Sequence, residues 1–205
     1  GQAIGITSAH TPHAAGARLD DAAAIRAAVD VPVITMGRLT ADAAEAALAD
    51  GRADLIGFGR PLLADPGLPD AIVAGDPEAA RPCAYQYRCI GNIFLHRPLA
   101  CAVRPETGRP AEPPRVAPRR ERVLVVGGGP VGMEAAHRLA DAGHAVALWE
   151  ATDRLGGLLV VAGAADPALA PLADWLRRRV ADAGVEVALD RRASVDDLAA
   201  AGVDR

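Results

Sequence analysis

The chain has 205 residues, of which 51% are hydrophobic, a formal net charge of -4 and a pI near 5.7. This length allows one or two domains with real cores, and an acidic chain without basic runs or an aromatic platform argues against a nucleic-acid partner. No apolar run is long enough to span a bilayer, the N-terminus lacks a signal-peptide pattern, and three cysteines favour a reducing compartment over a disulfide framework. The composition predicts a soluble, cytoplasmic protein without a membrane partner.

The two ends of the chain indicate a piece of a longer protein. Its first residue is Gly1 rather than methionine, and Arg205 falls inside a periodic segment. A nucleotide-binding fold also needs more strands than residues 123–205 can supply. We therefore expect a fragment, and the functional expectations below concern the complete protein.

Residues 1–75 are expected to alternate strands and helices. Short apolar runs predict buried strands, and alanine-rich stretches that follow Asp20 or Asp21 and Thr40 predict helices with these residues as N-caps. The expected elements are a strand over residues 3–7, a helix over 20–29, a strand over 31–35, a helix over 41–49 and a strand over 53–57. This spacing is typical of the last units of a (β/α)8 TIM barrel.

Two features of this region are candidates for binding. His10 and His13 lie in a loop, where they are metal ligands, active-site loop residues or ordinary surface histidines; no third ligand is near in sequence. Gly37-Arg38 and Gly59-Arg60 each follow an expected strand. Loops after the last two strands of such barrels often bind a cofactor phosphate, because glycine leaves backbone N–H groups accessible and arginine binds two phosphate oxygens. Strand-end glycines with solvent-facing arginines are the equally weighted alternative.

Residues 76–120 form a proline-rich segment in which long helices are not expected. It contains all three cysteines, Cys83, Cys89 and Cys101. Thiolates at this spacing suit an iron–sulfur cluster or zinc. Three buried apolar cysteines are the alternative, although clustering in a loop is unlike core usage. We refer to residues 76–120 as the cysteine segment.

Residues 121–205 begin with a nucleotide-binding pattern. A strand over residues 123–126 leads to Gly127, Gly129 and Gly132 in G-x-G-x-x-G spacing, then to a helix over 130–142 that Gly143 ends. A second strand, over 145–149, ends at Glu150, an acid that can bind ribose hydroxyls. The first glycine allows a tight turn, the second lets the backbone approach a pyrophosphate, and the third lets the helix pack against the strand. A glycine-rich turn in an ordinary βαβ unit is the alternative.

The chain continues with Leu155-Gly156-Gly157, a helix over residues 171–183 and a strand over 185–189 with alternating polarity. The buried face of the helix is expected to carry Leu172, Leu176 and Val180. The arginines at 177–179 are expected largely on its solvent face, without a function. This region therefore predicts an incomplete Rossmann-like domain.

In order and sequence these parts resemble the multidomain branch of the Old Yellow Enzyme family, the NADH:flavin oxidoreductases that include 2,4-dienoyl-CoA reductases and the trimethylamine and histamine dehydrogenases. The resemblance covers nearly the whole chain. The segments that carry it are PVITMGR at 32–38, ADLIGFGRPLLADP at 53–66, RPC at 81–83, CIGN at 89–92, CAVRP at 101–105, VVGGGPVG at 125–132 and residues 150–157.

The resemblance implies cofactors and their residues. It implies that Gly37, Gly59 and Arg60 hold the phosphate of FMN in the barrel. It further implies that the second domain binds FAD or ADP, with the ADP half held by Gly127, Gly129, Gly132 and Glu150 and approached by Gly156 and Gly157. The family binds a [4Fe-4S] cluster through four cysteines in the intervening segment.

The cysteine segment departs from the family at one position. Cys83, Cys89 and Cys101 match the first, third and fourth cysteines, whereas Gln86 stands at the second. Three outcomes remain open: a [3Fe-4S] cluster, an oxygen or nitrogen ligand at the fourth iron, or loss of the cluster.

By resemblance the complete protein passes electrons from NAD(P)H through FAD, and a cluster if present, to FMN and on to an activated alkene, a small-molecule substrate. Amine dehydrogenation without NAD(P)H and a non-catalytic nucleotide-binding remnant are the alternatives. Substrate-polarising residues would lie on earlier barrel loops, so no catalytic residue is assigned. We expect residues 1–205 alone to show no turnover. A homo-oligomer is compatible with the sequence.

Overall fold

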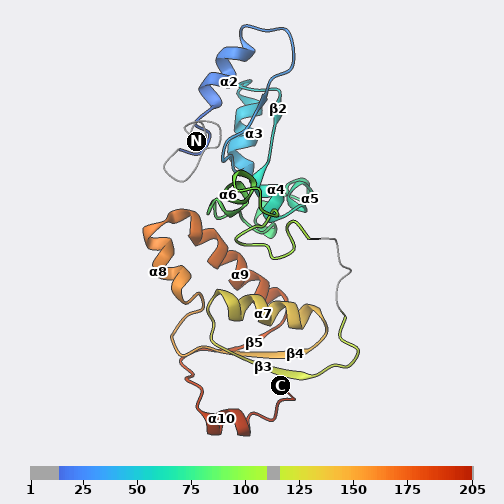
Figure 1. The fold of residues 1–205 in the computed structure, drawn as a ribbon, viewed down its shortest axis with the longest axis vertical. Helices are drawn as coiled ribbons and strands as arrows, with labels where there is room; N and C mark the ends of the chain where they lie inside the picture. Colours follow the sequence, from blue (N-terminus) through green and yellow to red (C-terminus); the bar gives the residue numbers. More distant parts are fainter. Residues whose placement is uncertain (1–13, 110–115, 205) are drawn as a thin grey trace. The chain divides into compact units, whose positions relative to one another are not determined.

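The structure is a computed structural model that describes residues 14–109 and 116–204. The chain divides into two compact units, Gly1–Arg109 and Pro110–Arg205, which are coloured blue to green and yellow to red in Figure 1. The three cysteines lie in the first unit and the glycine motif lies in the second. The expected strand over residues 3–7, together with His10 and His13, lies outside the described residues.

The first unit contains a β–α–β arrangement followed by short helices. Strands β1 and β2 are parallel, with Ile34 opposite Leu55 and Thr35 opposite Ile56, and α3 connects them. In chain order its elements are α2 (Leu19–Arg26), β1 (Ile34–Thr35), α3 (Ala41–Ala49), β2 (Leu55–Ile56), α4 (Arg60–Ala64), α5 (Leu68–Val73), the 3₁₀ turn η1 (Pro77–Ala79) and α6 (Arg88–Phe94).

Helix α3 forms as its sequence predicts. The Oγ1 atom of Thr40 accepts a hydrogen bond from the backbone N–H of Ala43 at 3.2 Å, so Thr40 is the N-cap. Ala44 and Ala47 face the core and are buried, and Gly51 follows the helix with φ +64°. The expected bounds of 41–49 are confirmed. Helix α2 is shorter than the expected 20–29.

The strands of this unit are shorter than the expected 31–35 and 53–57, and the prediction that residues 31–35 are buried was wrong for all but Thr35. Both strands have two residues, and Ile34 and Leu55 are 58% and 51% exposed. The described sheet of this unit has two strands, so each has an unpaired edge and little to cover its apolar side chains. Helices α4 and α5 were not predicted; α4 begins at Arg60, which was expected in a loop.

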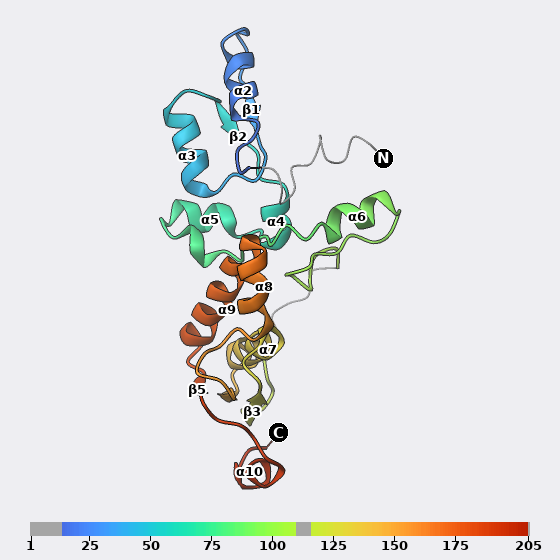
Figure 2. The same ribbon diagram turned by 90° about the vertical axis from the view of Figure 1, so that its left-hand side faces the viewer.

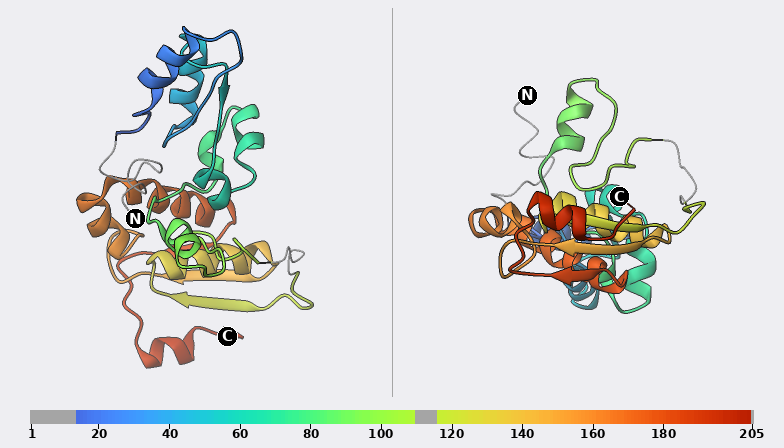
Figure 3. Two further views of the ribbon diagram at one scale, coloured as in Figure 1. Left: turned by 45° about the horizontal axis from the view of Figure 1, so that its top comes forward. Right: turned by 90° about the horizontal axis from the view of Figure 1, so that it is seen from below.

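The second unit is a parallel three-stranded sheet in the order β3-β4-β5. Helices α7 and α9 lie in the connections between successive parallel strands and pack against each other, and Figures 2 and 3 show these two helices side by side. Its elements are β3 (Arg122–Val126), α7 (Pro130–Asp141), β4 (Ala145–Trp149), α8 (Leu158–Ala165), the 3₁₀ turn η2 (Pro167–Leu169), α9 (Ala170–Asp182), β5 (Glu186–Ala188) and α10 (Val195–Ala200).

The core of this unit lies between the sheet and the two helices. Met133 on α7, Leu148 on β4 and Val180 on α9 are its largest fully buried side chains. Leu172 and Leu176 are buried beside Val180, which confirms the predicted apolar face of α9. Gly143, with φ +103°, follows α7 as expected. None of the described helices is long and apolar enough to cross a membrane.

Two expectations for this unit were wrong. Strand β3 is not buried: its end residues are exposed, with Val126 at 53%, because β3 is an edge strand of the described sheet. The strand expected over 185–189 is β5, which has only three residues. Both Val187 and Leu189 are exposed, so the alternation of polar and apolar residues does not predict which side chains are buried. Helices α8 and α10 were not predicted.

Candidate flavin, cysteine and dinucleotide sites

The two predicted phosphate arginines come together in the first unit. Arg38 follows β1 and Arg60 is the first residue of α4, and their guanidinium carbons lie 4.8 and 4.9 Å from the centre of one ring, that of Tyr85. Gly37 has φ +131°, which a residue with a side chain rarely adopts, and Gly59 has no atom within 4 Å of where a Cβ would stand. The backbone at both glycines is thus compatible with close approach by a ligand.

Burial also characterises this arginine pair. Both side chains are half-buried, and the Nε atom of Arg38 and the Nη1 atom of Arg60 are inaccessible to solvent without a hydrogen bond to these atoms, although both residues have other interactions. Tyr85, which joins the pair, was not predicted to belong to the site. Its sequence position among the cysteines gave no sign of contact with residues 38 and 60.

The three cysteines are free thiols. Cys89, on α6, is buried, and Cys83 and Cys101 are half-buried. Burial raises the pKa of the Cys83 thiol above its ordinary value of 9.0; a hydrogen bond from the Tyr85 backbone lowers it, Cys101 raises it, Arg60 lowers it and Cys89 raises it. The charges of the other two thiols and of Arg60 therefore act at Cys83.

The geometry of the cysteine segment argues against a single metal ion. Within residues 14–109 and 116–204, no three histidine, cysteine or acidic side chains are close enough together to hold one. The iron atoms of a cluster are bound by separate cysteines, so a cluster tolerates wider spacing than zinc does. Gln86 is exposed, and its side-chain amide donates to the carbonyl of Ala84 at 3.2 Å.

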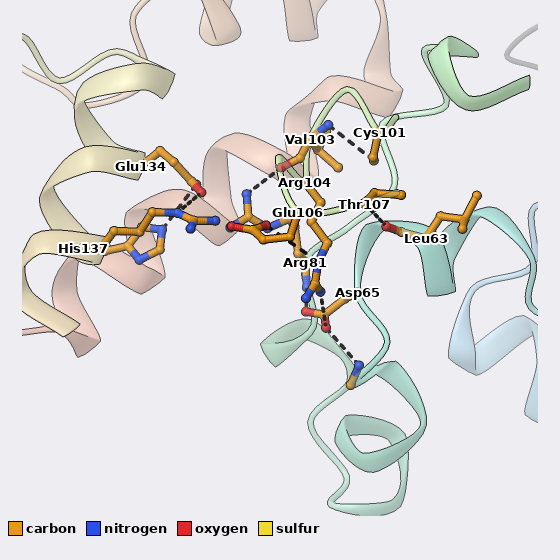
Figure 4. A network of polar contacts seen from close by, with 12 residues as sticks. Leu63, Asp65, Arg81, Cys101, Val103, Arg104, Glu106, Thr107, Glu134 and His137 are labelled. Atoms are coloured by element: carbon orange, nitrogen blue, oxygen red, sulfur yellow. Dashed lines mark hydrogen bonds and ion pairs between the residues drawn. The ribbon is translucent and has the colours of Figure 1, made fainter. Parts of the chain in front are cut away.

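Asp65, directly after α4, ties that helix to the cysteine segment (Figure 4). Its Oδ2 atom accepts the backbone N–H of Arg81 at 2.8 Å, and its Oδ1 atom accepts that of Gly67 at 2.9 Å. The guanidinium of Arg104 lies 3.5 Å from Oδ1. One carboxylate thus fixes residues on either side of the cysteines.

Two further hydrogen bonds in Figure 4 join the two ends of the cysteine segment and attach it to α4. The guanidinium of Arg81, which is 8% exposed, donates to the carbonyl of Val103 at 2.6 Å. The hydroxyl of Thr107 donates to the carbonyl of Leu63 in α4, also at 2.6 Å. Because Arg81 precedes Cys83 by two residues and Val103 follows Cys101 by two, these bonds hold the first and last cysteines in register.

The glycine loop between β3 and α7 has the geometry that its motif predicts. Gly127 has φ +100°, and neither it nor Gly129 has an atom within 4 Å of where a Cβ would stand. A Cβ at Gly132 would overlap the carbonyl oxygen of Gly127, so the third glycine allows helix and strand to pack. Gly128 was not singled out from the sequence, yet a Cβ there would overlap Leu155.

Glu150, at the end of β4, is buried and bound within this loop. Its Oε2 atom accepts the backbone N–H of Gly128 at 2.7 Å, and its Oε1 atom accepts the backbone N–H and the hydroxyl of Thr152 at 2.8 and 2.9 Å. Burial raises the pKa of Glu150, but hydrogen bonds from Thr152 and Gly128 outweigh it, so the pKa lies below its ordinary value of 4.5. The site holds an anionic carboxylate with acceptor capacity left on Oε2.

The lowered pKa of Glu150 predicts a pH-dependent contribution to stability. The ionised carboxylate stabilises the fold fully above the unfolded pKa, near 4.5, and this contribution is lost as the pH falls through the lower folded pKa. We expect E150Q to be less stable than the wild type at about pH 6, and this difference to shrink towards about pH 3. Urea unfolding of both proteins across this range measures it; a constant difference would contradict the assignment.

The loop at Gly156 and Gly157 lies against the glycine motif. The backbone N–H of Gly156 donates to the carbonyl of Gly128 at 2.8 Å, and a Cβ at Gly157 would stand 3.0 Å from the Cα of Gly129. Both residues have positive φ, +127° and +49°. The structure therefore brings the predicted residues 127–132, 150 and 156–157 together at the ends of β3 and β4.

Arg177 holds this loop in place, which corrects the prediction that it lies on a solvent face without a role. From α9 its Nε and Nη2 atoms donate to the carbonyl of Leu155 at 3.0 and 2.7 Å, and its Nη1 atom donates to Asp174 at 2.6 Å. Its neighbour Arg178 is exposed, as predicted. A bidentate guanidinium thus fixes the carbonyl that precedes Gly156 and Gly157.

We expect R177M to weaken binding of ADP to the complete protein by about fivefold, because an unclamped loop must be ordered on binding. R178M, one residue along on the exposed face, is the matched control and should bind like the wild type. R177K should not restore affinity, since an amine lacks the planar fork. Calorimetric titration with ADP measures all four proteins. If R177M and R178M bind ADP with equal affinity, Arg177 does not contribute to the nucleotide site.

Comparison with known proteins identifies both units. Residues 6–78 match the NADH:flavin oxidoreductase / NADH oxidase family, and residues 102–201 match the pyridine nucleotide-disulphide oxidoreductase family. The chain is 39% identical to a metal reductase of Desulforamulus reducens over 86% of this chain and 27% of that protein. It is 37% identical to a cinnamate reductase of Clostridium sporogenes over 88% of this chain and 28% of that protein.

Two solved structures have the same fold. A 2-naphthoyl-CoA reductase superposes with a TM-score of 0.91 at 29% identity, over 96% of this chain and 31% of that one. A histamine dehydrogenase from Rhizobium sp. 4-9 superposes with a TM-score of 0.84 at 29% identity, over 92% of this chain and 29% of that one. These flavoenzyme neighbours confirm the fold class, the end of a TIM barrel followed by part of a nucleotide-binding domain. The chain belongs to the multidomain NADH:flavin oxidoreductase family and spans less than a third of the length of these relatives.

Proposed function

We propose that the complete protein is a flavin-dependent, NAD(P)H-linked oxidoreductase that reduces an activated alkene, such as an enone or an enoyl thioester. One observation carries the proposal. A single chain contains, in order, an arginine pair after two barrel strands, a segment with three free thiols, and a glycine loop with an anionic acid at the next strand end. The family to which the chain belongs supports the same reaction class.

The first unit fits the phosphate of FMN. Gly37 and Gly59 leave room for the phosphate oxygens, and Arg38 and Arg60 supply two converging positive charges. When bound, the flavin supplies hydride and single-electron chemistry that no side chain of the chain can provide. The chain's own part is to bind the phosphate through guanidinium groups in which the Nε atom of Arg38 and the Nη1 atom of Arg60 are shielded from water.

The second unit fits the ADP half of FAD, or ADP itself. Gly127 and Gly129 leave space beside the N-terminus of α7, a helix of twelve residues whose first N–H groups suit a pyrophosphate, and Gly132 lets this helix pack on β3. Glu150 is anionic and retains acceptor capacity for a ribose hydroxyl. Gly156 and Gly157 lie beside this loop, and Gly156 is hydrogen-bonded to the carbonyl of Gly128.

We propose that Cys83, Cys89 and Cys101 bind an iron–sulfur cluster with three cysteine ligands. The three thiols are free, and the contacts of Asp65 and Arg81 hold the chain before Cys83 to the chain after Cys101. Three thiolates match the donor set of a [3Fe-4S] cluster, whereas a [4Fe-4S] cluster requires one further ligand at the position of Gln86. Free thiols also support a reducing, cytoplasmic location.

Oxidation of an amine is the second candidate, because the chain superposes on a histamine dehydrogenase almost as well as on a 2-naphthoyl-CoA reductase. The direction of electron flow separates the two. We expect NADH or NADPH to bleach the flavin absorbance of the anaerobic complete protein, and an enone to restore it. Bleaching by short-chain amines but not by NADH or NADPH would replace our proposal with amine dehydrogenation. No bleaching by either would favour a non-catalytic nucleotide-binding protein.

A further inference from the structure

Tyr85 lies where the cysteine segment meets the arginine pair. The residue stands between Cys83 and Gln86, yet its ring lies 4.8 Å from the guanidinium carbon of Arg38 and 4.9 Å from that of Arg60. The two arginines lie far apart in sequence, Arg38 in the loop after β1 and Arg60 at the start of α4. One aromatic side chain thus joins three stretches of the chain that are distant in sequence.

The contact has a clear physical effect on the arginines. Two guanidinium groups near one another repel, and each side chain has several rotatable bonds, so contacts that favour one conformer of each are needed to keep them together. An aromatic face is an electron-rich surface that attracts a cation within about 6 Å of its centre. Arg60 also lies 5.2 Å from the ring centre of Tyr87. The rings therefore favour the conformers in which both arginines converge.

The backbone around this cluster is held in an unusual conformation. Arg38, Tyr85 and Tyr87 have φ of +58°, +50° and +60°, and they are three of the five non-glycine residues with positive φ in the part of the chain that the structure describes. This left-handed conformation is disfavoured for bulky side chains, and such strain gathers at ligand-binding sites. Arg38, Tyr85 and Tyr87 each take part in a contact between an arginine and a tyrosine ring.

We propose that Tyr85 is a positioning residue that orients Arg38 and Arg60 for the phosphate monoester of FMN. This inference rests on the proposed FMN site and extends it to the cysteine segment. The ring would hold the two cations in place for the phosphate, and phosphate affinity would then depend on how the cysteine segment is folded. A dianionic phosphate then balances the two positive charges that the ring has brought together.

The test compares FMN with riboflavin, which lacks the phosphate, on the flavin-free complete protein. Y85L removes the aromatic face, whereas Y85F retains it. We expect Y85L to lower the affinity for FMN about tenfold and to leave the affinity for riboflavin within about twofold of the wild type. Y85F should bind both flavins like the wild type, because the cation–π contact does not need the hydroxyl.

The outcomes distinguish the role of Tyr85 from the existence of the FMN site. If Y85L and Y85F bind FMN equally, Tyr85 does not position the arginines. If Y85L weakens FMN and riboflavin alike, the substitution damages the fold in general and the inference fails as well. A wild-type protein that binds neither flavin would instead overturn the FMN site itself. Iron and sulfide counts on each variant report whether the cysteine segment stays intact.

Discussion

Substitution of Gly132 by alanine is expected to lower the free energy of unfolding of the nucleotide-binding unit by about 3 kcal/mol or more. A Cβ at this position would overlap the carbonyl oxygen of Gly127 and would stand 3.5 Å from Val125. The obstacle is backbone at the turn between β3 and α7, so no side-chain rotation relieves it. Chemical unfolding followed by the fluorescence of Trp149 and Trp175, both buried in this unit, measures the loss.

Gly129 provides the matched control for Gly132. Nothing lies within 4 Å of where its Cβ would stand, and its φ of -71° is ordinary for alanine. We therefore expect G129A to unfold like the wild type but to bind ADP at least about tenfold more weakly, because the added methyl occupies the approach of the pyrophosphate. A G129A protein with unchanged ADP affinity would show that the nucleotide does not bind at this loop.

Substitution of Asp65 by alanine is the second change with a large expected effect. It removes the acceptor of two backbone N–H groups, those of Gly67 and of the buried Arg81, and leaves Arg104 without this ion pair. We expect a loss of about 1–3 kcal/mol in the first unit, because the N–H of the buried Arg81 is left unsatisfied, whereas water can bind the exposed N–H of Gly67. The cluster should also be depleted, because Arg81 precedes Cys83 by two residues.

Two controls accompany the Asp65 experiment. D65N keeps the shape and one acceptor oxygen, so its loss of stability and of iron should be intermediate. E78A removes an exposed acid from η1 in the same unit and should change neither. Denaturant unfolding and iron and sulfide per chain are measured on each protein. If D65A unfolds like E78A and retains its iron, Asp65 does not hold the cysteine segment together.

Local patterns sufficed for the glycine loop and for several helices. The spacing of Gly127, Gly129 and Gly132 and the acid at 150 specify a turn, a helix start and a strand end within one βαβ unit, all of which the structure shows. Thr40 caps α3 for the same reason: the bond joins residues three apart. Such features are encoded by neighbours in sequence.

Tyr85 and Arg177 show what a sequence pattern leaves out. Tyr85 meets arginines 47 and 25 positions earlier, and Arg177 meets the carbonyl of Leu155 across 22 positions, so no local signal links the partners. Helical periodicity predicts that Arg177 lies largely on the solvent face of α9. It does not show that a long side chain there can reach back to a loop.

Burial of the strands was overestimated for a related reason. Apolar runs such as residues 123–126 predict strands that are covered on both sides, but coverage depends on which strands stand beside them. In the described sheets, β1 and β2 have one neighbour each and β3 is an edge, so Ile34, Leu55 and Val126 remain exposed. The polarity pattern specifies which residues are apolar, and the rest of the fold specifies which are covered.

The measurement that tests the central claim most directly is a count of what the complete protein releases. The protein is purified without oxygen and denatured in acid, and the released flavins, adenine nucleotides, iron and sulfide are quantified per chain. We predict FMN, one adenine nucleotide as FAD or ADP, and both iron and sulfide. Flavins without iron would contradict the role proposed for Cys83, Cys89 and Cys101. Release of no flavin at all would contradict the oxidoreductase function.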